Sequence, residues 1–385
     1  MTKVAIDDSL DIDERKLIGT AKSFARERVA PFAAGWERDR VFPLETLRAA
    51  AAAGLVGVML PREAGGKSIT HIAAARILEE LADADFAFAF SLWVHNNICH
   101  AVHRSGSQTL IGRFLESMLR GERVGAFCMT EPDVGSDAAN LATRAILAGD
   151  GWIMTGEKAW VTNGAVAEVL AVYARTGTAP GWRGIATFLV ETSLPGVERL
   201  PPYAMFGGNA MGVAGFRFDH APIGGDAMIL GPGDGFRTAM ADIDKARVFV
   251  AAGCLGILRS SLRTALAYGK RRKAFGRALL DFQDLQWSLV DVATNLEAAR
   301  LLTQKAAILL DKAEPATIAA AHAKKFATRA AVSGVSACIA AMGANGLRME
   351  TPLARHLAAA KIAETLDGTT AIQNVVIGRA LRDGS

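Results

Sequence analysis

The chain has 385 residues, of which 51% are hydrophobic and 21% charged, and its formal net charge is +4. This composition is that of a globular protein long enough for two or three domains, and it excludes a disordered chain. Positive charge is dispersed except in GKRRKAFGR at 269–277, so nucleic acid is not an expected partner.

The four cysteines are spaced too widely for a zinc knuckle or a CxxC redox pair. We therefore expect buried free thiols in a reducing compartment at Cys99, Cys128, Cys254 and Cys338. The first residues, MTKVAIDDSLDIDERK, are acidic and lack the apolar stretch of a signal peptide. We find no apolar run of the roughly 20 residues that a membrane helix needs. These features predict a cytoplasmic protein with no membrane partner.

Residues 1–121 have the pattern of a helical N-terminal domain. Apolar residues recur at three-to-four spacing in 69–84 and in 107–122, as on one face of a helix. Pro43 stands at a predicted helix start and Gly54 near the end of the same helix, where these residues are favoured.

Residues 122–231 change to short segments rich in β-branched and aromatic residues. Examples are 150–176, 184–191 and 215–223, and Gly, Asn-Gly and Pro punctuate them. This spacing is typical of an antiparallel sheet or barrel, so we expect a central antiparallel β-domain.

Residues 232–385 return to helical patterns. The segment 315–341 is rich in Ala and poor in charge, as in a helix buried on several sides. One apolar stripe of the preceding helix is formed by Leu285, Leu289, Val292, Leu296 and Ala299. Long helices with small faces predict a C-terminal four-helix bundle that can also pack against another subunit. The fold class expected is therefore α+β with three domains.

Two polar stretches border the β-domain. AFCMTEPDVGSD at 126–137 is by composition a polar loop. EKAWVTNG at 157–164 is either a core anchor with a hairpin turn or a segment that places an indole and a hydroxyl over a flat ligand, and from the residues alone the core anchor is favoured. Together, TEPDVGSD and KAWVTNG resemble the paired signature of the acyl-CoA dehydrogenase family. Further matches follow in the family's order, at LPREAGG (60–66), GPGDGF…DIDKARVFVAAG (231–253), RRKAFGRALLDFQ (271–283), GANG (343–346) and LDGTTAIQ (366–373).

The resemblance covers essentially the whole chain. It implies the same three-domain layout, FAD bound without covalent attachment, and usually a homotetramer built as a dimer of dimers. It also implies that the flavin ring lies between the β-domain and the bundle. The residues that would surround the ring, with Ser136 also facing the thioester-bearing arm, are Phe127, Met129, Thr130, Ser136, Trp160 and Thr162.

A second group of cofactor residues is implied for the phosphates and adenosine, partly across a subunit boundary. A guanidinium fork suits phosphate oxygens, glycine lets a backbone approach a neighbour's cofactor, and the start of the last helix favours anions. The residues at the matching positions are Arg272, Phe275, Gln283, Gly343, Gly346 and Thr369.

Asp367 stands before Gly368-Thr369-Thr370, between two helix-like runs. From the residues alone it is either the N-cap of the last helix, a position that Asp favours, or a base that removes a proton. The resemblance favours the base, because the family has its catalytic Glu here. Asp is one methylene shorter, and a misplacement of about 1 Å can cost roughly 100-fold in rate. Asp at this place resembles two minorities, enzymes that dehydrogenate alicyclic carboxyl-CoA thioesters and nitroalkane oxidases.

Some family members carry the base on the first bundle helix, where this chain has Ala246. Asp367 is then the matching carboxylate, with Arg247 expected beside it to orient the carboxylate or the substrate. The substrate-binding residues that the resemblance implies are Ser136, Asp244, Arg247 and Gly368. The chain departs from the family's usual Arg-Asp pair and from two usual Gln residues at Ala358-Ala359, Ala371 and Ala340.

The expected function is FAD-dependent α,β-dehydrogenation of an acyl-CoA thioester, with electrons passed to electron-transfer flavoprotein. Asp367 suggests a cyclic or branched acyl group. Three alternatives stay open: a flavin oxidase of a small carbon acid, a catalytically silent subunit of a hetero-oligomer, and a dehydrogenase of an acyl group on a carrier protein. No metal is expected, because His95, His100 and His103 do not have the spacing of a metal site.

Overall fold

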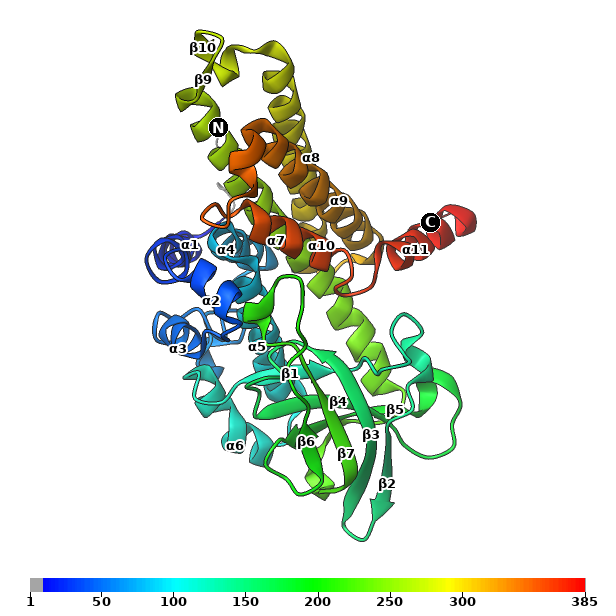
Figure 1. Ribbon diagram of the computed structural model, residues 1–385. Helices are drawn as coiled ribbons and strands as arrows, with labels where there is room; N and C mark the ends of the chain where they lie inside the picture. The colour runs from blue at the N-terminus through cyan, green and yellow to red at the C-terminus, as the bar shows by residue number, and fades with distance from the viewer. Residues whose placement is uncertain (1–9, 385) are drawn as a thin grey trace.

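The computed structural model describes residues 10–384, and the expectation of no signal peptide falls largely on residues 1–9, outside this range (Figure 1). The N-terminal part is helical, and its first helix runs on through a π-helical turn at Ala25–Val29. The helices are α1 (Ile12–Phe24), α2 (Ala33–Asp39), α3 (Leu44–Ala52), α4 (His71–Ala84), α5 (Phe86–Ser105) and α6 (Gln108–Leu119).

Side-chain caps fix where several of these helices begin. The Thr70 hydroxyl accepts the N–H of Ala73 at the start of α4, and Asp85 accepts the N–H of Phe88 at the start of α5. The sequence analysis does not single out α5, because its opening FAFAF alternates as a strand does. Helix α5 is buried along most of its length, which explains why its apolar residues do not keep to one face.

The central domain is an eight-stranded sheet in the order β6-β7-β3-β2-β4-β5-β8, with β1 paired to β4 off this path. Most neighbouring pairs are antiparallel, as expected, but β1 and β2 each pair with β4 in parallel, so the sheet is mixed. Strand patterning predicts burial and carries no information on the direction of the partner. The strands are β1 (Gly125–Cys128), β2 (Arg144–Ala148), β3 (Gly151–Val161), β4 (Val169–Arg175), β5 (Ile185–Glu191), β6 (Val197–Arg199), β7 (Ala214–Ile223) and β8 (Met228–Leu230).

The C-terminal part is a helical bundle. The predicted stripe on α8 is confirmed, since Leu289, Val292, Leu296 and Ala299 are buried and Leu285 packs against the same core. Figure 1 shows α11 leaving the bundle and projecting away from it. The elements are α7 (Asp234–Arg271), the small hairpin β9 (Lys273–Ala274) and β10 (Arg277–Ala278), α8 (Gln283–Asp311), α9 (Thr317–Met342), α10 (Leu353–Ala363) and α11 (Thr370–Asp383).

Helices α7 and α9 are long and apolar enough to cross a membrane by length and composition alone. The expectation that no apolar run reaches this length was therefore wrong. The apolar window of α7 is 83% buried inside the fold, and α7 packs against both α4 and α9. Its apolar character belongs to a core helix that joins the N-terminal helices, the sheet and the bundle.

Candidate active site

Asp367 lies in the loop at 364–369 between α10 and α11. Its backbone is left-handed, with φ of 48°, and Gly368 follows with φ of 91°. The N-cap of α11 is Thr369, whose hydroxyl accepts the N–H of Ile372 at 3.4 Å. The interpretation of Asp367 as the cap is therefore wrong, because α11 begins at Thr370 and the Thr369 hydroxyl caps it.

Three helices hold the backbone of this loop. From α7, Arg247 Nε donates to the Asp367 carbonyl at 3.2 Å, and from α11, Gln373 Nε2 donates to the Gly368 carbonyl at 2.9 Å. From α9, Lys324 Nζ donates to the Gly368 carbonyl at 2.6 Å and to the Glu364 carbonyl at 3.0 Å. These bonds stabilise a left-handed Asp, a conformation that costs roughly 1–2 kcal/mol in a side-chain-bearing residue.

Arg247 is buried and is itself held in place. Its Nη1 donates to Asp244 Oδ1 at 2.6 Å, and the other oxygen of Asp244 accepts the Thr317 hydroxyl at 2.5 Å. The structure thus brings Asp367, Gly368, Thr369, Arg247 and Asp244 together.

The Asp367 carboxylate is half-buried, and within residues 10–384 its buried Oδ2 has no hydrogen-bond partner. Burial raises the pKa of Asp367 to about 6, and the cations of Lys324 and Arg247 oppose the rise. Such a carboxylate is ionised near neutral pH and has a free lone pair, so it can accept a proton.

Lys324 was not predicted from the sequence, because it lies in the AKKFA run of α9 beside Lys325 and no motif distinguishes the two lysines. Gln373 ends the LDGTTAIQ stretch, but its two bonds to the loop were not foreseen. The low charge of α9 was the available signal, because a lysine on a helix buried on several sides needs internal partners.

The implied flavin-ring residues lie on and beside β1 and β3. Met129 and Thr162 are buried, Phe127 and Thr130 are half-buried, and Ser136 is exposed on the loop after β1. Trp160 is 59% exposed, has a left-handed backbone with φ of 58°, and packs against the Tyr203 ring at a centroid distance of 4.5 Å. An exposed Trp with a left-handed backbone, two residues before Thr162, offers an uncovered ring face to a flat ring such as a flavin.

The loop after β6 connects this surface to the bundle. Gly207 and Gly208 in that loop lie against Ala358 and Ile362 of α10, so closely that a Cβ on either glycine would clash. Ala358 and Ala359 are both buried, which explains one departure from the family pattern, because this packing leaves no room for a charged pair.

A buried ion pair supports the loop after β1. Lys158 Nζ lies 2.7 Å from Glu131 Oε1 and also donates to the Met129 carbonyl at 3.1 Å. The Glu131 carboxylate additionally accepts the N–H groups of Ala142 and Thr143. The backbone at Met129, one of the implied flavin residues, is therefore rigidly placed.

Apart from Thr369, which caps α11 two residues after Asp367, the implied phosphate and adenosine residues lie at the other end of the bundle. Arg272 directly follows α7 and is 25 residues beyond Arg247, which at 1.5 Å per helical residue separates the two by roughly 37 Å. Phe275 is 95% exposed at the tip of the β9–β10 hairpin, and Gln283 opens α8 nearby. Asn345, between Gly343 and Gly346, donates to the Tyr268 hydroxyl at 2.9 Å and so joins the same end.

Packing and backbone conformation within the same chain also require glycine at Gly343 and Gly346. Gly343 has a φ of 58°, where a side chain is strained, and a Cβ on Gly346 would lie 2.5 Å from the Ile339 carbonyl oxygen. Within one chain, the implied cofactor residues therefore form separate groups: Thr369 in the Asp367 loop, the residues on and beside β1 and β3, and those at the β9–β10 end.

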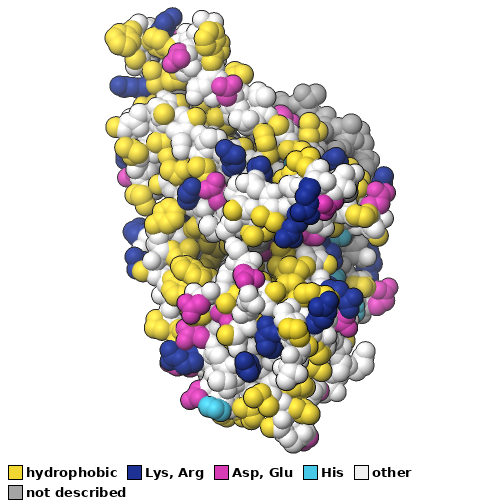
Figure 2. Space-filling model, turned by 90° about the vertical axis from the view of Figure 1, so that its right-hand side faces the viewer, with side chains coloured by type: hydrophobic (Ala, Val, Ile, Leu, Met, Phe, Trp, Pro, Cys, Tyr) yellow, Lys and Arg dark blue, Asp and Glu magenta, His cyan; other side chains and the backbone are white. Residues whose placement is uncertain are grey.

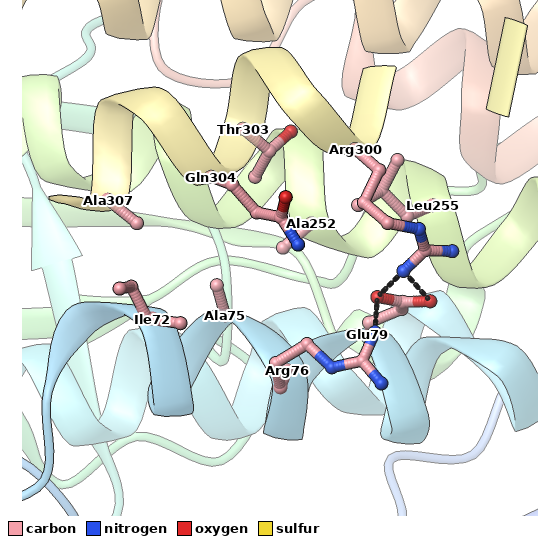
Figure 3. Close-up of a pocket in the computed structure, with 10 residues that line it drawn as sticks. All are labelled: Ile72, Ala75, Arg76, Glu79, Ala252, Leu255, Arg300, Thr303, Gln304 and Ala307. Carbon is pink, nitrogen blue, oxygen red and sulfur yellow. Dashed lines mark hydrogen bonds and ion pairs between the residues drawn. The ribbon is translucent and has the colours of Figure 1, made fainter. Parts of the chain in front are cut away.

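Figure 2 shows the face on the α11 side of the molecule. It is hollowed at mid-height, where hydrophobic side chains gather, and Lys and Arg side chains stand around the hollow. A separate small pocket lies between α4, α7 and α8 and contains none of the predicted site residues (Figure 3). There Arg300 Nη1 binds both oxygens of the buried Glu79, at 3.0 and 2.8 Å, so this carboxylate is fully paired.

The histidines and cysteines have structural surroundings. His95 accepts the N–H of Gly125 at Nδ1 and faces the Met118 carbonyl at Nε2, and burial lowers its pKa to about 4. All four cysteines are buried free thiols, as expected. In the described part of the chain, no three His, Cys, Asp or Glu residues form a possible metal-binding group.

Comparisons with known proteins give the same result along the whole chain. Three family models match it: the acyl-CoA dehydrogenase N-terminal domain at 12–122, the middle domain at 126–221 and the C-terminal domain at 233–382. The short-chain specific acyl-CoA dehydrogenase of Homo sapiens mitochondria is 33% identical over 368 residues, which is 95% of this chain and 89% of that protein.

Solved structures agree with these matches. Butyryl-CoA dehydrogenase from Megasphaera elsdenii superposes with a TM-score of 0.93 at 29% identity, over 99% of this chain and 100% of that one. A glutaryl-CoA dehydrogenase from Mycobacterium smegmatis in complex with FADH2 superposes with a TM-score of 0.92 at 27% identity, over 98% and 96% of the two chains.

Proposed function

The chain belongs to the acyl-CoA dehydrogenase family, whose cofactor is FAD, and on this premise we propose that it desaturates an acyl-CoA thioester between Cα and Cβ, with Asp367 as the base. The observation that carries the proposal is the Asp367 carboxylate, which has a pKa of about 6 and a buried oxygen with no hydrogen-bond partner among the residues that the structure describes.

In this reaction the Asp367 carboxylate accepts the α-proton of the thioester. Bound FAD supplies the acceptor for the β-hydride. Arg247 holds the Asp367 carbonyl, and Asp244 holds Arg247, so the base keeps one orientation during the transfer. Trp160 and the residues of the loop after β1 would hold the flavin ring on the β-domain side, and Ser136 would contact the thioester arm.

The substrate is proposed to carry a ring or a branch near the reacting carbons. Asp is one methylene shorter than Glu, so the α-carbon must come closer to the loop backbone. The other family position for a base is filled here by Ala246, which is 7% exposed and has no acidic group. Electron-transfer flavoprotein is the proposed electron acceptor, and the cytoplasm the proposed location.

The proposed assembly is a homotetramer, a dimer of dimers. Large apolar side chains lie uncovered on α8, where Trp287 is 57% exposed and Leu301 57% exposed. The separation of Arg272 from Asp367 along the bundle also favours two chains per cofactor, since one chain's own groups lie far apart. In this assembly Arg272, Phe275, Gln283, Gly343 and Gly346 would serve the neighbouring chain's FAD, and Thr369 its own. The three domains proposed remain 1–121, 122–231 and 232–385.

The test is an anaerobic panel of linear, branched and cyclic acyl-CoA thioesters added to the flavin-loaded protein. Loss of flavin absorbance with a cyclic or branched member, and not with the Asp367→Asn variant, is the expected result. Hydrogen peroxide formed in air from nitroalkanes, without bleaching by any thioester, would instead support the oxidase. Equal bleaching of wild type and Asp367→Asn would overturn Asp367 as the base.

A further inference from the structure

Lys324 is a fully buried lysine with no carboxylate partner within residues 10–384. It is 0% exposed, and among the described residues it forms no salt bridge within 4.0 Å. Its ammonium group instead donates to the carbonyls of Glu364 and Gly368, which bracket Asp367 along the chain. Burying an ammonium group without a carboxylate partner costs free energy of folding, so we infer that Lys324 has a role at Asp367 that offsets this cost.

The two carbonyls that Lys324 binds define the shape of the loop. Glu364 is the residue directly after α10 and Gly368 precedes the cap of α11, so one ammonium group joins the end of one helix to the start of the next. Between them, Asp367 and Gly368 take consecutive left-handed conformations. Lys324 thus holds the backbone of the turn that sets the direction of the Asp367 side chain.

The charged groups around the site come from several elements. Asp367 faces Lys324 from α9 and Arg247 from α7, while Lys324 faces Asp367, Glu364 at the end of α10, and Arg247 and the Cys254 thiol of α7. Burial raises the pKa of Cys254 to about 12, so this thiol stays neutral. Burial lowers the pKa of Lys324 to about 8, and Asp367 opposes the change. Arg247 is already neutralised by Asp244 at 2.6 Å.

We propose that Lys324 is the positioning residue of the base: it holds the 364–368 loop in the shape that presents the Asp367 carboxylate, and its positive charge keeps that carboxylate ionised. The inference rests on the proposed function of Asp367. It assigns to Lys324 no contact with substrate or cofactor.

The first experiment is the pH profile of kcat/KM for the flavin-loaded enzyme. In wild type we expect a rise through pH about 6, from Asp367, and a fall above pH about 8, from Lys324. Lys324→Met should move the acid limb upward by about 1 pH unit and lower kcat by about 10- to 100-fold, with KM little changed. Lys324→Arg keeps the charge, so it should retain the acid limb and remove the fall above pH 8.

The matched control is Lys325→Met, the same change at the next position of α9, where the side chain is half-buried and makes no contact with the loop among the described residues. It should leave both limbs and kcat unchanged. An acid limb at the wild-type pH in Lys324→Met would overturn the inference, as would a kcat loss in Lys325→Met equal to that in Lys324→Met.

The second experiment needs no turnover. The free energy of unfolding is compared between pH 4 and 9 for wild type, Asp367→Asn, Lys324→Met and the double variant. The pH range over which wild type and Asp367→Asn diverge reports the titration of Asp367 in the folded protein, and it should end near pH 6. In the Lys324→Met background the divergence should extend to higher pH. An unchanged range would overturn the inference.

The two experiments separate the failures. If wild type acts on no thioester, the proposed function fails, while the unfolding series still decides whether Lys324 controls the Asp367 carboxylate. If Lys324→Met does not fold, the inference is tested by comparing the pH profiles of kcat/KM of wild type and Lys324→Arg. A wild-type profile that stays flat above pH 8 and coincides with that of Lys324→Arg would overturn the inference.

Discussion

Two buried lysines lie near two acidic residues in this protein, and the pairs have opposite characters. In the β-domain, the Lys158 ammonium group lies 2.7 Å from the Glu131 carboxylate, and two backbone N–H groups also donate to that carboxylate. In the bundle, Lys324 donates to carbonyls on both sides of Asp367, and in the described part of the chain the buried Oδ2 of Asp367 has no hydrogen-bond partner. Burial acts on both acids, but the pKa of Glu131 is lowered overall by Lys158 while that of Asp367 is raised.

The difference shows how the same two residue types serve structure in one place and chemistry in another. A carboxylate with all its partners is an anion that holds backbone in place, as Glu131 does for the loop after β1. A carboxylate near a cation but without direct bonds keeps its basicity, as Asp367 does. The positive charges of Lys324 and Arg247 lower the pKa of Asp367 from nearby, without forming hydrogen bonds that would occupy its lone pairs.

The largest effect should come from removing the base. Asp367→Asn should lower kcat by about 100- to 10,000-fold, the range for loss of a general base. It should also raise the free energy of unfolding by about 1–3 kcal/mol at pH 8, because it removes a carboxylate whose pKa is raised to about 6 and whose ionised form burial disfavours.

Turnover and chemical denaturation measure these two changes, and Asp219→Asn at an exposed site provides the matched control. The gain in stability should vanish below pH about 4, where Asp367 is protonated in both the folded and the unfolded state. A loss of stability at pH 8 would contradict this description of Asp367.

The next effect should come from breaking the direct pair. Lys158→Met leaves Glu131 buried without its cation and should lower the free energy of unfolding by about 3–5 kcal/mol. The double change Glu131→Gln with Lys158→Met should recover part of this loss. Denaturant titration measures both, with the exposed Lys305→Met as control. If Lys158→Met and Lys305→Met are equally stable, the pair does not support the loop.

The pH dependence should separate the two acids. As pH falls below about 6, Asp367 gains a proton and kcat/KM should drop about tenfold per unit. Glu131 has a lowered pKa, so the stability that it contributes is present above its unfolded pKa of about 4.3 and is lost only at lower pH. Activity should therefore fall reversibly while near-UV circular dichroism stays native at pH 5. Simultaneous loss of both signals would contradict the separation.

The smallest effect should come from the turn. Gly368→Ala places a Cβ at a φ of 91°, within 3.1 Å of Gln373 Nε2 and 3.4 Å of Arg247 Nη2. We expect a loss of about 1–3 kcal/mol in stability, and a lower kcat because the base shifts. Gly112→Ala in α6, where a Cβ meets nothing within 4 Å, should be neutral or slightly stabilising. Thermal unfolding and turnover compare the two.

Sequence patterns gave the three-part layout because periodicity and turn residues are local properties. The helices around 69–84 and 107–122 and the stripe on α8 were predicted in this way. Strand direction was not, because β1 and β2 pair with β4 through contacts distant in sequence. Helix α5 was missed for a related reason, since burial on all sides erases the one-faced pattern.

The site was predicted only where a motif marks it. The motif places Asp367, Gly368 and Thr369 in one turn, but the residues alone could not choose between cap and base, because Asp and Thr both cap helices. The structure assigns the cap to Thr369. Lys324 carries no motif that the sequence analysis could use, and only the tertiary packing of α9 against the loop distinguishes it from Lys325.

The length of α7 has a genetic consequence. One helix carries Arg247 beside the base and ends at Arg271, directly before Arg272 and the hairpin, so under the proposed assembly each subunit gives its base to one flavin and its hairpin to another. A chain defective at Asp367 and a chain defective at Arg272 would then each be inactive as homo-oligomers. Co-expressed, the two defective alleles would complement each other, since some mixed assemblies pair an intact turn with an intact hairpin.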